Sequence, residues 1–352
     1  MGKKNKIPVA VLGATGMVGQ RFVQLLADHP WFELTALAAS ERRVGQPYGE
    51  SCQWVLDGEM PEKAAGLSIQ PPQPGLDARI VFSALPAQWA REVEPLFATA
   101  GYAVCSNASA YRAEPDVPLL IPEINHEHLG LIERQRVQRG WKGLIVTSPN
   151  CTTTGIALPL KPLHDALGVE KLFAVSMQAV SGAGYPGISY LDIEGNVIPF
   201  INGEEEKIEQ ETRLLLGSMS GSQRLPAEMK ISAQANRVSV KDGHTVCLSI
   251  GFKRKPSPSE VIDALREFKG SPGMPQLPSS PNEIIVVRDE PDRPQPRRDR
   301  DTHNGMSIVI GRVRECPLLD VRMVSVSHNT MRGAASGSIL NAELLAASGY
   351  VS

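Results

Sequence analysis

Short apolar runs alternate with amphipathic stretches through the first half of the chain. Residues 7–12 (IPVAVL) form a continuous apolar run, as expected of a parallel strand that is buried on both faces. A stretch follows in which Val18, Phe22, Leu25 and Leu26 fall on one face of a helix. Further strand-like runs occur in FELTALAA, ARIVFSALP and GYAVCSNAS. This alternation predicts an α/β fold built on a Rossmann-type, doubly wound sheet.

The second half of the chain predicts an α+β domain. LFAVSMQAV indicates a strand, GEEEKIEQET a helix, and NRVSVKDGHTVCLSIGF a hairpin with its turn at Asp242 and Gly243. After a proline-rich excursion over residues 270–304, MSIVIGRVR predicts another strand, and the chain ends in a strand, a turn and a helix. We expect a nucleotide-binding domain over 1–150, completed by a C-terminal helix over 330–352, and a catalytic and substrate domain over 151–329.

Composition narrows the class of protein. With 352 residues, 42% of them hydrophobic, the chain can bury two separate cores. A net charge of −2 gives no long-range attraction to nucleic acid or an anionic membrane, which favours a small-molecule partner. The N-terminus passes from a basic start into a strand without a cleavage site, and no apolar run has membrane-spanning length. Five widely spaced cysteines without C-x-x-C argue against disulfides and a thiolate metal site, so we predict a cytoplasmic protein without a bound metal.

A glycine-rich turn joins the first strand to the first helix. Its glycines have G-x-x-G-x-x-G spacing, which differs from the usual dinucleotide fingerprint, G-x-G-x-x-G. Such a turn also serves simply to pack a helix on a strand. Here it opens a helix whose free N–H groups and dipole can hold a pyrophosphate. We therefore expect cofactor contacts at Gly13, Thr15, Gly16, Met17 and Val18.

The end of the second predicted strand bears on the choice of dinucleotide. In such folds this strand end meets the adenosine ribose. Ser40 and Arg42 suit a 2′-phosphate and favour NADP, whereas Glu41 could bind the free ribose hydroxyls of NAD. Ser83, at the end of another strand, lies on the edge where these sheets bind ligands.

The stretch SPNCTTTG places Cys151 at the start of a predicted helix. A thiol there is either a small buried hydrophobe or a nucleophile whose pKa the positive end of the helix lowers. Pro159 and Pro162 predict a short helix that then kinks or restarts.

Five further polar residues are candidates for the same chemistry. Gln178 ends a strand and can orient a substrate, while the glycines of SGAG (181–184) permit close backbone approach to a ligand. His244 can supply the base that a thiol nucleophile needs, although a histidine after a turn is often merely exposed. Arg237 can bind a carboxylate with a bidentate fork. Glu204 and Lys207, taken alone, resemble an ordinary solvated i,i+3 pair.

Seven motifs together resemble those of the aspartate-β-semialdehyde dehydrogenases, in particular the branch common in archaea and fungi. GATGMVG, SNASAYR, SPNCTTTG, QAVSGAG, GEEEKI, NRVSVKDGH and SHNTMRGAASGSILNAELL occur in the family's order and span nearly the whole chain. The resemblance implies a catalytic thiol, an acid–base histidine and an orienting amide at Cys151, His244 and Gln178. It implies substrate and phosphate contacts at Arg112, Asn150, Glu204, Lys207 and Arg237, and further cofactor contacts at Ser181, Gly182 and Asn329.

The implied reaction is the reversible, NADP-dependent reductive dephosphorylation of β-aspartyl phosphate to aspartate semialdehyde through a Cys151 thioester. It belongs to the biosynthesis of lysine, threonine, methionine and isoleucine. The resemblance also implies a homodimer or homotetramer that associates through the second domain. Malonyl-CoA reduction on the same scaffold is the alternative, because it would use the same thiol, histidine and cofactor site. A non-catalytic NADP-binding protein is a remote second alternative.

Overall fold

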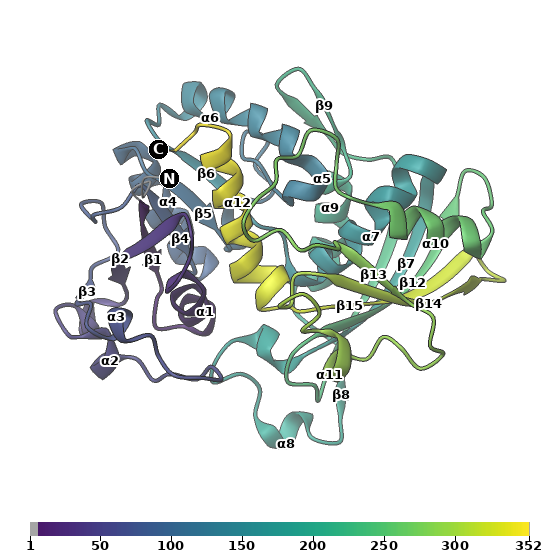
Figure 1. Cartoon of the computed structure of the whole chain (residues 1–352), viewed down its shortest axis with the longest axis horizontal. Helices are drawn as coiled ribbons and strands as arrows, with labels where there is room; N and C mark the ends of the chain where they lie inside the picture. Colours follow the sequence, from purple (N-terminus) through teal and green to yellow (C-terminus); the bar gives the residue numbers. More distant parts are fainter. Residues whose placement is uncertain (1–5, 352) are drawn as a thin grey trace.

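The computed structural model describes residues 6–351, which form two sheets lying side by side with helices packed against them (Figure 1). Residues 1–5 and 352, which include the outermost residues of the expected first domain, lie outside the described residues. Among residues 6–351, no helix has both the length and the apolar character needed to cross a membrane.

The first sheet has six parallel strands in the order β3-β2-β1-β4-β5-β6. This order is that of a Rossmann fold, and it confirms the predicted doubly wound sheet. At the carboxyl edge Leu12 lies opposite both Ala38 and Ser83, so the loops after these strands meet at one ligand-binding edge. The strands are β1 (Ile7–Leu12), β2 (Phe32–Ala38), β3 (Ile69–Gln70), β4 (Ile80–Ser83), β5 (Ala103–Ser106) and β6 (Leu144–Thr147).

Successive strand residues face two different cores, because side chains alternate across a strand. Phe82 packs with α1 and α12 on one face, whereas Val81 packs with α4 on the other. Helix α12 returns along the chain to this sheet (Figure 1). Its residues Leu340 and Leu344 are buried in the same core as Phe22. The helices around the sheet are α1 (Met17–Leu26), α2 (Tyr48–Ser51), α3 (Glu62–Ala65), α4 (Ala87–Ala100), α5 (Pro122–Asn125), α6 (Leu131–Arg139) and α12 (Ser336–Ala347).

The second sheet has seven strands of mixed direction in the order β13-β14-β15-β12-β7-β11-β8. One face is covered by α7, α9 and α10, whose residues Leu160, Ile208 and Leu265 share a core with Leu248. On the opposite face Phe173 is 44% exposed, and no described helix packs over it. The strands are β7 (Val169–Gln178), β8 (Val197–Ile198), β11 (Lys230–Val238), β12 (His244–Phe252), β13 (Ile285–Arg288), β14 (Ile308–Glu315) and β15 (Val321–Ser327), and the helices are α7 (Cys151–Leu167), α9 (Glu204–Leu215) and α10 (Pro258–Glu267). Short elements complete this half: α8 (Tyr190–Ile193), α11 (Pro296–Asp299), and a small hairpin of β9 (Ser218–Ser220) and β10 (Gln223–Leu225).

The predicted hairpin between β11 and β12 is wrong. Both strands pair with β7, β11 in parallel and β12 antiparallel, so β7 lies between them. The connecting segment crosses the end of β7, where the carbonyl groups of Val240 and Lys241 accept hydrogen bonds from Val180 and Ser181. Gly243 does occupy the positive-φ turn position (φ +97°) that suggested a hairpin. The sequence therefore predicted the turn correctly, but not which strands pair with each other.

The predicted break in the helix after Cys151 is also wrong, because α7 runs without interruption from Cys151 to Leu167. Pro159 has no N–H, so it leaves the carbonyl oxygen of Gly155 without its helical donor. The hydroxyl of Ser325, on β15, donates to that oxygen at 2.8 Å. A tertiary hydrogen bond therefore replaces the missing backbone bond and lets the helix continue.

Candidate active site

Helix α7 begins where the two sheets meet, with Cys151 as its first residue. The side chain of Asn150 caps the helix, because its Oδ1 accepts hydrogen bonds from the backbone of Thr152 (2.8 Å) and Thr153 (3.1 Å). Cys151 is only partly buried. On its other side the chain returns as Gly333, where a Cβ atom would lie 2.6 Å from the Cβ of Cys151. Only glycine fits this close approach beside the thiol.

The thiol faces a buried histidine. Sγ of Cys151 lies 3.2 Å from Nε2 of His244, which is the first residue of β12 and has 0% exposure. The other ring nitrogen, Nδ1, accepts a hydrogen bond from the backbone N–H of Ala179 at 3.1 Å. Burial lowers the pKa of His244 to about 3, and the positive charge of Arg237 adds to the effect. The ring is therefore neutral at physiological pH.

The start of α7 acts on the Cys151 thiol in the expected direction, because the N–H of Thr152 lowers its pKa, but the net shift is upward. Burial raises the pKa of this thiol to about 12, and the nearby carboxylate of Glu204 raises it further. The positive charges of Arg112 and Arg237 and the N–H of Thr152 act in the opposite direction but do not prevail. The thiol is neutral in this structure, next to a neutral imidazole.

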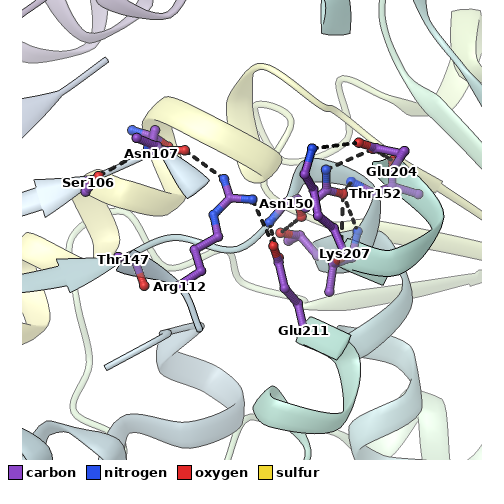
Figure 2. Close-up of polar contacts among 12 residues, drawn as sticks. Ser106, Asn107, Arg112, Thr147, Asn150, Thr152, Glu204, Lys207 and Glu211 are labelled. Carbon is purple, nitrogen blue, oxygen red and sulfur yellow. Dashed lines mark hydrogen bonds and ion pairs between the residues drawn. The ribbon is translucent and has the colours of Figure 1, made fainter. Parts of the chain in front are cut away.

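Glu204, at the start of α9, connects several of the predicted residues. Its Oε1 accepts hydrogen bonds from Asn150 Nδ2 (2.8 Å), Gln178 Nε2 (3.1 Å) and Thr152 Oγ1 (3.3 Å), while Lys207 Nζ lies 4.0 Å from Oε2 (Figure 2). Glu204 is 6% exposed, so this is not the solvated pair that the spacing alone suggested. Its carboxylate joins α9, β7 and the start of α7.

Glu211 is a site residue that sequence reasoning missed. Its Oε2 accepts the backbone N–H of Asn150 at 2.6 Å, and its Oε1 accepts from Arg112 Nη1 at 3.0 Å (Figure 2). Arg112 is held a second time by its Nη2, which donates to the carbonyl of Asn107 at 2.7 Å. Glu211 follows Glu204 by seven residues, two turns along the same helix face, and this spacing was the available signal.

Arg237 and Asn329 close the other side of the site. Arg237 is 5% exposed, and its Nη1 donates to the carbonyl oxygen of Ala179 at 2.7 Å. Asn329 accepts from Gly243 N at 2.9 Å and donates to Ser181 Oγ at 2.8 Å. A Cβ at Gly182 would lie 2.8 Å from Arg237 Nη1, so a larger residue there would displace the guanidinium.

The glycine-rich turn fits a dinucleotide pyrophosphate. Gly13 has φ +73°, and a Cβ there would lie 2.8 Å from the carbonyl oxygen of Ala84. No side chain caps α1, and its first turn has no acidic residue. The backbone N–H groups near Met17 and Val18 can therefore donate hydrogen bonds to an anion. Gly16 is exposed, and Thr15, Met17 and Val18 are partly exposed. Met17 and Ser181 line one cleft of about 170 Å³ that joins the two halves of the chain.

The remaining predicted cofactor residues divide into two groups. Ser40 and Arg42 are exposed just beyond the end of β2, where a ribose phosphate can reach them. Ser83 is fully buried beside the carboxyl of Glu94, so its hydroxyl is closed to a ligand in this structure and does not fit the predicted contact. Within residues 6–351, no three histidine, cysteine or acidic side chains lie close enough to hold a metal ion.

Comparison with known proteins agrees with this geometry. Residues 8–132 match the family model of the semialdehyde dehydrogenase NAD binding domain, and residues 160–332 match that of the semialdehyde dehydrogenase dimerisation domain. The chain is 56% identical over 338 residues to an aspartate-semialdehyde dehydrogenase of Archaeoglobus fulgidus, covering 96% of this chain and 97% of that protein. It is 45% identical over 364 residues to one of Cryptococcus neoformans, covering 100% of both.

A solved structure gives the same result. The crystal structure of aspartate semialdehyde dehydrogenase with NADP from Candida albicans superposes with a TM-score of 0.90 at 42% identity, covering 98% of this chain and 100% of that chain. The likeness to an archaeal and fungal branch, inferred from seven motifs, is confirmed by relatives from both groups. The chain belongs to the aspartate-semialdehyde dehydrogenase family.

Proposed function

We propose that this chain is an NADP-dependent aspartate-semialdehyde dehydrogenase of amino-acid biosynthesis. It converts β-aspartyl phosphate to aspartate semialdehyde and phosphate, reversibly, on the route to lysine, threonine, methionine and isoleucine. The observation that carries the proposal is the 3.2 Å approach of Cys151 Sγ to His244 Nε2 at the start of α7. A thiol beside a ring nitrogen suits covalent capture of an acyl group, which divides one difficult step into two.

The charged side chains around this pair match the substrate's charges. The guanidinium of Arg237 is placed to bind the α-carboxylate, and Arg112 and Lys207 to bind phosphate. Glu204 accepts three hydrogen bonds through Oε1, whereas Oε2 faces Lys207 Nζ at 4.0 Å. Oε2 is therefore the atom that we assign to the substrate ammonium.

For the cofactor we propose NADP. When bound, the nicotinamide supplies the hydride, and the chain provides the pyrophosphate turn and the exposed Arg42 for the 2′-phosphate. The crystal structure of the Candida albicans enzyme with NADP supports this choice. Asn329 and Gly182 line the approach to Cys151 from the cofactor side, and their roles are part of the same proposal.

The alternative of malonyl-CoA reduction has no support from the relatives compared, which are named aspartate-semialdehyde dehydrogenases. A buried carboxylate at Glu204 also favours a substrate with an ammonium group, which malonyl-CoA lacks. The preformed pair of Cys151 and His244 argues against a non-catalytic protein.

We also propose that the chain works as a cytoplasmic homodimer or homotetramer that associates through the second sheet. The uncovered face around Phe173, on β7, is continuous with strands of the dimerisation domain match. Residues 1–150 with 330–352 would then form the cofactor domain, and residues 151–329 the catalytic and associating domain. Sedimentation as a stable monomer at micromolar concentration would count against this assembly.

The test of function compares two reactions of the purified chain. We expect NADP reduction with aspartate semialdehyde plus phosphate, and little NADPH oxidation with malonyl-CoA. Cys151→Ser should abolish turnover while leaving NADP affinity within about a few-fold of wild type, because only the nucleophile is lost. Robust turnover with the CoA thioester alone would overturn the substrate assignment.

A further inference from the structure

The carboxylate of Glu211 joins the arginine that we assign to phosphate to the backbone just before the nucleophile. Its Oε1 accepts from Nη1 of Arg112 at 3.0 Å, and its Oε2 accepts from the backbone N–H of Asn150 at 2.6 Å (Figure 2). Glu211 is 4% exposed, so both contacts are shielded from water. Each oxygen of this buried carboxylate therefore holds one donor.

Both contacts together require a carboxylate at this position. Arg112 Nη1 and the backbone nitrogen of Asn150 can only donate, so the group between them must accept twice. Glutamine has nearly the same shape but one acceptor oxygen, and its amide nitrogen would face a second N–H. A buried donor that loses its acceptor destabilises the arrangement around it. Glu211→Gln is therefore an almost isosteric change that must break one of the two contacts.

The contact with Glu211 also fixes the orientation of the Arg112 guanidinium. Nη2 of Arg112 donates to the carbonyl oxygen of Asn107 at 2.7 Å, so both ends of the planar fork are held. Nε of Arg112 and Nδ2 of Asn107 are buried, and among residues 6–351 neither atom has a hydrogen-bond partner. Two donors therefore remain for an anion. Lys207, one turn before Glu211 on α9, adds a second positive charge on the same helix face.

We propose that Glu211 is a positioning residue that sets where bound phosphate lies relative to the sulfur of Cys151. Arg112 follows β5 of the first sheet, whereas Asn150 directly precedes Cys151 and Glu211 lies on α9. One carboxylate thus ties the guanidinium to the backbone of the nucleophile. Without it, Arg112 keeps its charge but loses its fixed orientation. The inference deepens the proposed function and rests on it for the assignment of Arg112 to phosphate.

Only one of the two chemical steps uses phosphate. In the oxidative direction, capture of the aldehyde by Cys151 and hydride transfer to NADP give the thioester, NADPH and one proton. A phosphate oxygen then adds its electron pair to the thioester carbon, the carbon–sulfur bond breaks, and its pair leaves with sulfur. The proton of hydrogen phosphate ends on the sulfur, which restores the thiol. Because this attack needs a defined orientation of the reacting atoms, Glu211 should matter for the second step alone.

Rapid mixing separates the two steps. NADP and aspartate semialdehyde without phosphate should give a burst of about one NADPH per site, and Glu211→Gln should keep the burst rate within about three-fold of wild type. With phosphate present, kcat/KM for phosphate should fall about 10- to 100-fold in this variant, the effect of losing one charge-assisted contact. Glu206→Gln, on the exposed side of α9, should change neither rate. A burst that is lost in parallel, or a variant that does not fold, would identify Glu211 as structural and overturn the proposal.

A double-mutant cycle tests whether Glu211 acts through Arg112. Arg112→Ala should lower kcat/KM for phosphate at least as much as Glu211→Gln does. In the Arg112→Ala background, Glu211→Gln should cost less than about two-fold more, because the glutamine oxygen can then serve Asn150 alone. Losses that multiply would overturn the proposal. A wild-type protein that gives no burst with aspartate semialdehyde would instead refute the proposed function, so the two failures are distinguishable.

Discussion

Replacing Glu204 with glutamine should move thiol reactivity and substrate use in opposite directions. Glutamine keeps an oxygen that can accept from Asn150, Gln178 and Thr152, so the local geometry should survive. What it removes is the negative charge. That charge raises the pKa of Cys151, so the variant should have a lower thiol pKa and faster alkylation by iodoacetamide.

The cost to substrate use follows from the assignment of Glu204 Oε2 to the substrate ammonium. If Oε2 binds the substrate ammonium, losing one charge-assisted hydrogen bond removes about 2 kcal/mol of binding. That corresponds to about a thirty-fold fall in kcat/KM for aspartate semialdehyde. Alkylation rates by mass spectrometry and NADP reduction by absorbance measure the two effects on the same preparation.

Glu206→Gln is the matched control, because it makes the same charge change one half-turn away on the exposed side of α9. It should leave both rates near wild type. Slower alkylation in Glu204→Gln would refute the electrostatic reasoning about the thiol. Unchanged kcat/KM would refute the assignment of Glu204 to the ammonium.

Three further predictions concern the cofactor, the pH dependence and the long helix. Arg42→Ala should weaken NADP binding by about 1.5–3 kcal/mol and leave NAD nearly unchanged by calorimetry; equal losses would exclude a 2′-phosphate contact. Burial raises the pKa of Glu94 from 4.5 to about 7, so the folded state binds this proton more tightly than the unfolded state does. The contribution of the bound proton to the free energy of unfolding is therefore fully present below pH 4.5 and is lost as the pH rises through 7. The difference in free energy of unfolding between Glu94→Gln and wild type, measured with denaturant, should therefore shift in favour of the variant by up to about 3 kcal/mol between pH 4.5 and pH 8. A difference that does not change with pH would contradict this. Ser325→Ala should cost about 1–3 kcal/mol, because the carbonyl of Gly155 is left without a donor, whereas Ser327→Ala on the same strand should cost less; equal costs would show that this bond does not support α7.

Local sequence patterns predicted the elements but not their partners. The apolar run 7–12 and the glycine turn after it specify a strand and a helix whatever the rest of the chain does. The pairing of β11 and β12 with β7 instead depends on residues about 60 to 80 positions apart in sequence. The continuity of α7 past Pro159 depends on Ser325, 170 residues away from Gly155. Neither the strand pairing nor the continuity of the helix can be predicted from the neighbouring residues alone.

The active site likewise contains residues that the sequence identified and residues that it did not. Cys151 and His244 were found because their motifs resemble a family, and the structure places them in contact. Glu211 was missed because its partners, Arg112 and Asn150, come from distant segments, and only its spacing from Glu204 marked it. The net upward shift of the Cys151 pKa was not predicted, because the helix start is visible in the sequence, whereas burial and the nearby charge of Glu204 are not.

Helix α12 completes a sheet whose first strand, β1, lies more than 300 residues earlier in the chain. Helix α12 fills the core under the sheet that starts at β1, and Gly333 forms the wall against Cys151. The sheet that starts at β1 therefore cannot finish folding until α12 has been translated, although N-terminal domains generally fold first. A nascent chain, or one cut short by a premature stop before Gly333, lacks both the buried helix and the wall beside the nucleophile. Such fragments should depend on chaperones and be cleared by proteases, so that only chains that include Gly333 and α12 reach the active state.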